Sequence, residues 1–177
     1  MKKALLIALV LFIAVISTAC INNIAVQELN NKAAEYMQKG DYESAVNRLQ
    51  ASIDLDSTMY ETYYNLGIAA TNAKKYDIAI EALENGIKIK PDFSNFYYSL
   101  AVAQAELAES LVETDEDKKE ISEEDKNKAK ELKTSAIANA QKYLEMNPQA
   151  EDKDEVEEFI EDLNREEKEE QQVVLKG

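Results

Sequence analysis

The stretch YETYYNLGIAATNAKKYDIAIEALENGIKIKPDF, residues 60–93, decides how this chain folds. Moving it back by 34 residues places Tyr76 on Tyr42. Leu83 then falls on Leu49. Within each copy the apolar residues recur three and four positions apart, which is the spacing of one face of an α-helix. A 34-residue period of this kind predicts a row of helix-turn-helix units in which each unit covers the next.

The composition is that of an acidic, helical protein without an obvious set of catalytic residues. The 177 residues include 35 Asp and Glu against 20 Lys and Arg, for a net charge of −15. Nucleic acid is a poor candidate partner, because phosphate binding requires a clustered basic face. The chain has no histidine and one cysteine, so the commonest general base and the commonest metal ligands are missing. We therefore expect no enzyme, no cofactor, no metal site and no small-molecule substrate.

The first 19 residues have the order of a secretory signal peptide. A cationic start, Met1-Lys2-Lys3, precedes the apolar run from Ala4 to Ile16 and the small residues Ser17-Thr18-Ala19. The apolar run is 13 residues long, short of the roughly 20 that span a bilayer as a helix. Residues 1–19 are thus predicted to be a leader, and a transmembrane anchor is the alternative.

Cys20 follows the leader directly, and the ending Ser17-Thr18-Ala19-Cys20 resembles the lipobox of bacterial lipoproteins. Ser17 departs from that pattern, which usually has an aliphatic residue there. The resemblance implies lipidation of Cys20, with residues 20–25 as a lipidated tether in the bacterial cell envelope. Ile21 follows the cysteine, which by the same resemblance favours an outer membrane location facing the periplasm in a Gram-negative cell. The alternative is a secreted protein with a free thiol.

Glycine and proline residues mark the boundaries between the segments in the rest of the chain. Pro91 closes the second unit, and Pro148 closes the third. A strict period would place the last proline at 125, so the third unit contains an insertion of 23 residues. The predicted segments are a first repeat at 26–59, a second at 60–93, a third at 94–148 with the insertion near 113–130, an amphipathic capping helix at 152–172 and a tail at 173–177. The first helix of the second repeat is predicted to run from Thr58 to Ala73.

The second unit resembles the tetratricopeptide repeat (TPR) family. The resemblance rests on Tyr63, Leu66-Gly67, Tyr76, Ala79, Leu83, Gly86 and Pro91, which stand where that family has its aromatic, Leu-Gly, Tyr, Ala, large apolar, Ala and Pro signature. The first repeat matches less well, with Ser52 in the place of the second Ala. The family implies an all-α fold, a right-handed α-α superhelix of about three repeats closed by the capping helix.

The insertion is rich in charge, but a helix start is visible inside it. Ser122 followed by acidic residues reads as an N-cap with carboxylates in the first turn. We expect two overlong helices joined near 114–119 in a protruding hairpin, and a disordered linker is the alternative. Asp115-Glu116-Asp117 lacks the glycine and the distal glutamate of a calcium loop, so we interpret it as solvated charge.

In tetratricopeptide arrays the first helices of successive repeats line a concave groove, and this implies a set of candidate binding residues. They are Asn30, Asn31, Ala34 and Gln38 from the first repeat, Tyr64, Asn65, Ile68 and Asn72 from the second, and Tyr98, Ser99, Val102 and Glu106 from the third. Tyr64 and Tyr98 are 34 residues apart and should lie in register. The alternative is that these tyrosines only pack between repeats.

The sequence favours a membrane-tethered scaffold or adaptor that binds a partner protein or peptide of the envelope in this groove. The inserted hairpin is a rival binding surface. A self-associating structural or spacer protein of the envelope is the alternative function. The carboxylate clamp of some heat-shock cochaperones is not expected, because Asn30, Asn95 and Ser99 occupy positions where that pattern has basic residues.

Overall fold

The computed structural model of the chain describes residues 24–113 and 121–174, with side chains up to residue 165. Within these ranges the chain consists of helices joined by turns, without a strand. The helices span residues 24–38, α2 (Tyr42–Leu55), α3 (Tyr60–Asn72), α4 (Tyr76–Ile89), α5 (Asn95–Val112), α6 (Glu123–Met146) and α7 (Lys153–Val174). The predicted leader at 1–19 and Cys20 lie outside the described residues, and so does the predicted junction of the hairpin helices.

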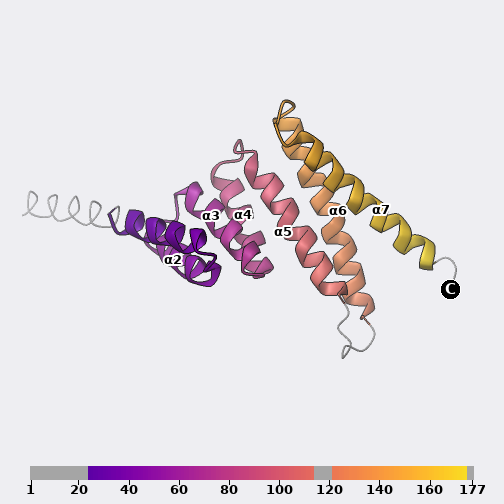
Figure 1. Cartoon of the computed structure of the whole chain (residues 1–177), viewed down its shortest axis with the longest axis horizontal. Coiled ribbons are helices and arrows are strands. Elements are labelled where there is room, and N and C mark those ends of the chain that lie inside the picture. The colour runs from indigo at the N-terminus through magenta and orange to yellow at the C-terminus, as the bar shows by residue number, and fades with distance from the viewer. Residues whose placement is uncertain (1–23, 114–120, 175–177) are drawn as a thin grey trace, which may run out of the picture.

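The helices follow one another along the long axis of the molecule, each beside the next (Figure 1). Consecutive helices from α2 to α7 pack against each other, and α3 also contacts α5. The pairs 24–38 with α2, α3 with α4, and α5 with α6 are the three predicted repeats. The predicted all-α fold of helix-turn-helix repeats is confirmed.

The turns inside the first two repeats use the same backbone geometry. The helix over 24–38 ends before Gly40, which has φ of 74°, and Lys74 takes the corresponding place in the second repeat with φ of 57°. Asp41 then caps α2, because its carboxylate accepts a hydrogen bond of 3.1 Å from the backbone N–H of Ser44. Left-handed backbone suits glycine and strains other residues, so the two turns differ in strain.

One predicted helix boundary is wrong. The spacing predicts that the first helix of the second repeat begins at Thr58, whereas α3 begins at Tyr60. The carboxylate of Asp56 accepts hydrogen bonds from the backbone N–H and the hydroxyl of Thr58, at 2.9 and 2.7 Å. These bonds hold Thr58 in the turn between α2 and α3.

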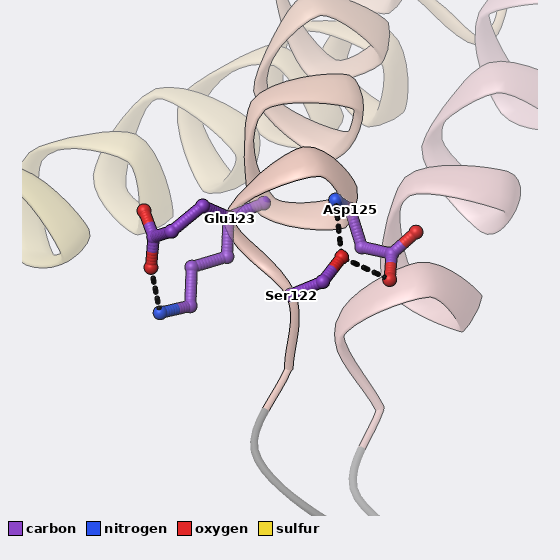
Figure 2. A network of polar contacts seen from close by, with 4 residues as sticks. Ser122, Glu123 and Asp125 are labelled. Carbon is purple, nitrogen blue, oxygen red and sulfur yellow. Dashed lines mark hydrogen bonds and ion pairs between the residues drawn. The ribbon is translucent and has the colours of Figure 1, made fainter.

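The third repeat is longer than the second, as the insertion predicted. Helices α5 and α6 have 18 and 24 residues, against 13 and 14 for α3 and α4. Figure 2 shows how α6 begins: the hydroxyl of Ser122 accepts from the backbone N–H of Asp125 at 3.0 Å and donates to its carboxylate at 2.6 Å. The predicted N-cap at Ser122 is confirmed. The segment 114–120, where the two helices join, is outside the described residues.

Small residues let the helices of the second repeat approach closely. A Cβ placed on Gly67 would fall on the side chain of Leu83, and one placed on Gly86 would fall on the ring of Phe96. Leu83 and Phe96 are fully buried. The two glycines therefore have packing roles, because neither leaves room for a larger residue.

Helix α7 covers the end of the array. Val156 and Leu163 are buried against the third repeat together with Ala101, Ala136 and Ala140. The predicted capping role of this helix is confirmed. Among the described residues no helix is both long enough and apolar enough to cross a membrane.

Candidate binding groove

An open pocket of about 260 Å³ lies between α5 and α7. Helix α5 is the first helix of the third repeat, and α7 lies where the first helix of a fourth repeat would lie. We call this pocket the α5–α7 groove, and its lining residues are Val102, Ala105, Glu106, Glu109, Val112, Lys133, Phe159, Asp162 and Leu163. Two of the predicted site residues, Val102 and Glu106, are among them.

The surface of this groove is part apolar and part acidic. Val102, Ala105 and Phe159 are half-buried, so each keeps some surface for a ligand. Glu106 and Glu109 are exposed and lie three positions apart on α5. Residues with this spacing share one face of a helix.

Three further polar contacts surround the groove. The hydroxyl of Tyr76, in α4, donates to the carboxylate of Glu106 at 3.2 Å. Asp162 pairs with the exposed Arg165 at 2.7 Å. Lys133, in α6, is 5% exposed, so its side chain forms part of the groove wall rather than of the accessible rim.

The two candidate tyrosines both pack against other rings. Tyr64 meets Phe93 and Phe96 edge-on, with ring centroids 5.2 and 5.6 Å apart. Tyr98 stacks on Tyr143 at 5.4 Å. Both candidate tyrosines stay half-buried. These contacts agree with the alternative interpretation, in which the tyrosines pack between repeats. Part of each side chain nevertheless stays accessible.

Phe159 connects the ring of Tyr98 to the capping helix. The two centroids are 6.0 Å apart, with the rings at right angles. Since Phe159 also lines the α5–α7 groove, Tyr98 stands beside the groove but is not among its lining residues.

Asn30 has a structural role. Its carboxamide donates to Val26 O at 3.0 Å and to the hydroxyl of Ser52 at 2.9 Å, and it accepts from the hydroxyl of Thr62 at 3.2 Å. Ser52 and Thr62 are almost completely buried. These bonds join the helix over 24–38 to α2 and α3, so we leave Asn30 out of the candidate site.

The remaining predicted residues differ in exposure. Asn31, Ala34, Gln38 and Asn72 are exposed, whereas Asn65, Ile68 and Ser99 are half-buried. The carboxamide of Asn72 donates to Ile68 O on its own helix at 2.8 Å. None of these seven residues lines the α5–α7 groove.

Burial and, to a lesser extent, nearby carboxylates raise the pKa values of tyrosines on both sides of α5. Burial, the hydrogen bond to Asp152 at 2.7 Å and the charge of that carboxylate raise the pKa of Tyr143 to about 12. Burial and the charges of Asp152 and Glu155 raise the pKa of Tyr98. Carboxylates thus dominate the electrostatics where α7 meets the third repeat.

The other side of α5 is similar. Burial raises the pKa of Tyr76, and the carboxylates of Glu106, Glu109 and Glu113 add to that shift. A second pocket of about 610 Å³ lies there, between the turn that precedes α4 and the end of α5, lined by Lys74, Lys75, Tyr76, Asp77, Ile78, Leu107, Ser110 and Glu113. Its two lysines and two carboxylates cancel, so the formal net charge of its lining is zero.

Neither pocket offers a group of metal ligands in the part of the chain that the structure describes. Over residues 24–113 and 121–165, no three His, Cys, Asp or Glu side chains are arranged to hold a metal ion.

Two overlapping segments match known families: residues 33–70 match the family described as TPR repeat, and residues 60–93 match the tetratricopeptide repeat. Residues 33–93 of this chain are thus similar to tetratricopeptide repeats. A curated relative, small glutamine-rich tetratricopeptide repeat-containing protein 2 of Mycosarcoma maydis, is 27% identical over 81 residues, which are 46% of this chain and 23% of that protein. The chain therefore covers less than a quarter of that relative's length.

Several solved structures share the fold. The second TPR domain of human RPAP3, in complex with an HSP70 peptide, has a TM-score of 0.62 at 14% identity, over 79% of this chain and 98% of that chain. The Yersinia enterocolitica type III secretion chaperone SycD, in complex with a peptide of the translocator YopD, has a TM-score of 0.58 at 17% identity, over 82% of this chain and 93% of that chain. At these identities the likeness concerns the fold.

Seven residues that line the groove were not among the predicted binding residues: Ala105, Glu109, Val112, Lys133, Phe159, Asp162 and Leu163. Phe159 lies on the apolar face of the helix predicted at 152–172, together with Val156, Ile160 and Leu163. The sequence therefore held a signal for Phe159 as a groove residue. A helix that caps a tetratricopeptide array lies where the first helix of the next repeat would lie, and so it borders the groove.

Proposed function

We propose that the chain is a non-catalytic adaptor whose α5–α7 groove binds a segment of a partner polypeptide. The observation that carries this proposal is the open pocket with half-buried Val102 and Phe159 at its floor and exposed Glu106 at its rim. Accessible apolar surface beside a few polar groups is what ligand sites in proteins present. Peptides bound to tetratricopeptide structures of the same fold support the proposal.

The accessible surface of α3 extends the proposed site along the array. The carboxamide of Asn65 makes no side-chain hydrogen bond with any residue in the described ranges, and it is half-buried. A carboxamide can donate to and accept from the backbone of an extended peptide. Asn65 and Ile68 would then contact the partner beyond the α5–α7 groove.

Site-specific photocrosslinking in intact cells tests the proposal. A photoreactive residue in place of Val102 should capture a partner polypeptide, and the same residue in place of Glu84, exposed on α4, should not. Val102 suits this test better than Tyr64 or Tyr98, because their rings pack between helices. Equal capture from both positions would overturn the proposal, and a product made only of two copies of the chain would favour the self-associating spacer.

We also propose that the adaptor is tethered to a membrane of the bacterial cell envelope through a lipid on Cys20. The leader-like residues 1–19 and the small residues before the cysteine support this assignment. The first described helix begins at residue 24, so a lipid on Cys20 would hold the repeats close to the bilayer. In a Gram-negative cell, Ile21 favours the outer membrane, facing the periplasm.

Metabolic labelling tests the tether. Labelled fatty acid should be incorporated into the wild type and be lost in Cys20→Ala. Incorporation that survives the substitution would refute Cys20 as the modified residue.

A further inference from the structure

We propose that the α5–α7 groove selects a cationic amphipathic segment, in which Lys or Arg side chains alternate with apolar ones. This inference rests on the proposed function and names the chemistry of the partner. It combines an apolar floor, formed by Val102, Ala105 and Phe159, with carboxylates on the rim at Glu106 and Glu109.

The two rim carboxylates are available to a partner's cation. Among the residues that the structure describes, neither Glu106 nor Glu109 forms an ion pair. Glu106 accepts a hydrogen bond from Tyr76, which is a neutral donor and leaves the carboxylate charge in place. Both carboxylates are exposed and share one face of α5, so one short peptide can reach both.

The groove lining has more carboxylates than cations, with Glu106, Glu109 and Asp162 against Lys133. Arg165 is paired with Asp162 at 2.7 Å. Lys133 is buried in the wall and already has an interaction partner. The exposed rim on α5 therefore remains negative.

The surroundings reinforce the sign. Asp152 and Glu155 act on Tyr98 at one side of the groove, and Glu113 acts on Tyr76 at the other. The whole chain carries a net charge of −15, so its overall field has the same sign as the rim. An anionic peptide would have to approach like charges, which disfavours it.

Fluorescence anisotropy with synthetic peptides tests the inference on the purified full-length chain. The probe is a labelled peptide of repeated Lys-Leu-Leu, and its counterpart has Glu in place of Lys. The double variant Glu106→Gln with Glu109→Gln removes the rim charges, and Glu81→Gln with Glu84→Gln is the matched control. The control pair is exposed on α4, outside both pockets, and makes the same change in net charge.

The Lys-Leu-Leu peptide should bind more tightly than the Glu-Leu-Leu peptide. The rim variant should weaken its binding roughly three- to tenfold, the effect of losing two partly exposed ion pairs, and the control should change it less than about twofold. The rim effect should also shrink as salt is raised.

Three outcomes would overturn the inference. Equal binding of the two peptides, or equal loss in the rim and control variants, would show that the rim charges do not select the partner. If neither peptide binds, a cationic amphipathic segment is rejected as the ligand of the groove. Capture at Val102 but not at Glu84 in the crosslinking experiment would still support the adaptor function, so the two proposals fail separately.

Discussion

The junction between the first and second repeats and the junction between the second and third are built from corresponding positions with different chemistry. At the first junction Asn30, Ser52 and Thr62 form a hydrogen-bonded group. At the second, the residues 34 positions further on are Tyr64, Gly86 and Phe96. There the Phe96 ring covers the bare backbone of Gly86, and Tyr64 meets that ring edge-on at 5.6 Å.

At these three positions the two junctions are filled in different ways, by a hydrogen-bonded polar group at the first and by aromatic rings against a glycine at the second. Ser52 departs from the small apolar residue of the family signature, and its hydroxyl accepts from Asn30. Gly86 is smaller still, because a ring stands where the first junction has the side chain of Thr62. Each set is consistent within itself, so single exchanges between the sets should be costly.

The third junction extends the series. Tyr98 is 34 residues after Tyr64, and Tyr143 has the same distance to Pro148 as Gly86 has to Pro91. Here two aromatic residues stack at 5.4 Å, and the hydroxyl of Tyr143 donates to Asp152 at 2.7 Å. The positions that are polar at one end of the array are thus aromatic at the other.

The largest effect is expected at the second junction. Gly86→Ala should lower the free energy of unfolding by about 3 kcal/mol, because the added methyl group overlaps the buried Phe96 ring. Chemical denaturation measures the loss. Combining Gly86→Ala with Phe96→Leu should cost at least about 1 kcal/mol less than the sum of the single changes. Strict additivity would contradict the close contact.

The first junction should respond to loss of its hydrogen bonds. Asn30→Ala is expected to cost about 2 kcal/mol, since the buried hydroxyls of Ser52 and Thr62 each lose a partner. Asn31→Ala, the exposed neighbour, is the control and should stay within about 0.5 kcal/mol of the wild type. Similar losses in the two variants would mean that the polar group does not hold this junction together.

The contribution of the third junction to folding stability should depend on pH. The pKa of Tyr143 is raised in the folded chain from its ordinary value of 10.0 to about 12, so the fold favours the protonated phenol. This contribution to stability is fully present below pH 10 and is lost as the pH rises to about 12. Tyr143→Phe should lose about 1 kcal/mol at neutral pH with the hydrogen bond to Asp152.

Melting curves between pH 8 and pH 12 measure the difference between wild type and Tyr143→Phe. The wild type should lose more stability over this range than the variant, which lacks the titrating group. Parallel curves would show that the phenol of Tyr143 is not protected by the fold.

The smallest effect concerns the turns within the repeats, where Gly40 and Lys74 occupy corresponding left-handed positions. Lys74→Gly should raise the free energy of unfolding by about 0.5–1 kcal/mol, because it removes the backbone strain of a side chain at φ of 57°. Lys74→Ala removes the same charge and keeps the strain, so it should give no such gain. Equal stabilisation by both would point to charge instead.

Most of the helical framework could be predicted from the sequence, because its start and stop signals are local. Gly40, Asp41, Pro91 and Ser122 each act on the backbone beside them, and the helices end or begin there. Thr58 was placed wrongly, since one side chain, Asp56, holds the turn open for two more residues.

The contacts between helices could not be predicted in the same way. Asn30 was assigned to a binding surface because its register matches Tyr64 and Tyr98. Its partners lie 22 and 32 residues away, and no local pattern indicates them. The groove likewise depends on the place of α7, whose Phe159 and Asp162 meet α5 only in the folded chain.

The binding of a polypeptide segment in the α5–α7 groove is tested most directly by NMR mapping. Titrating the labelled full-length chain with the Lys-Leu-Leu peptide should perturb the amides of Val102, Ala105 and Phe159 more than any others. Perturbations centred instead on Lys74 to Ile78, beside the second pocket, or spread evenly over the helices, would contradict this binding site.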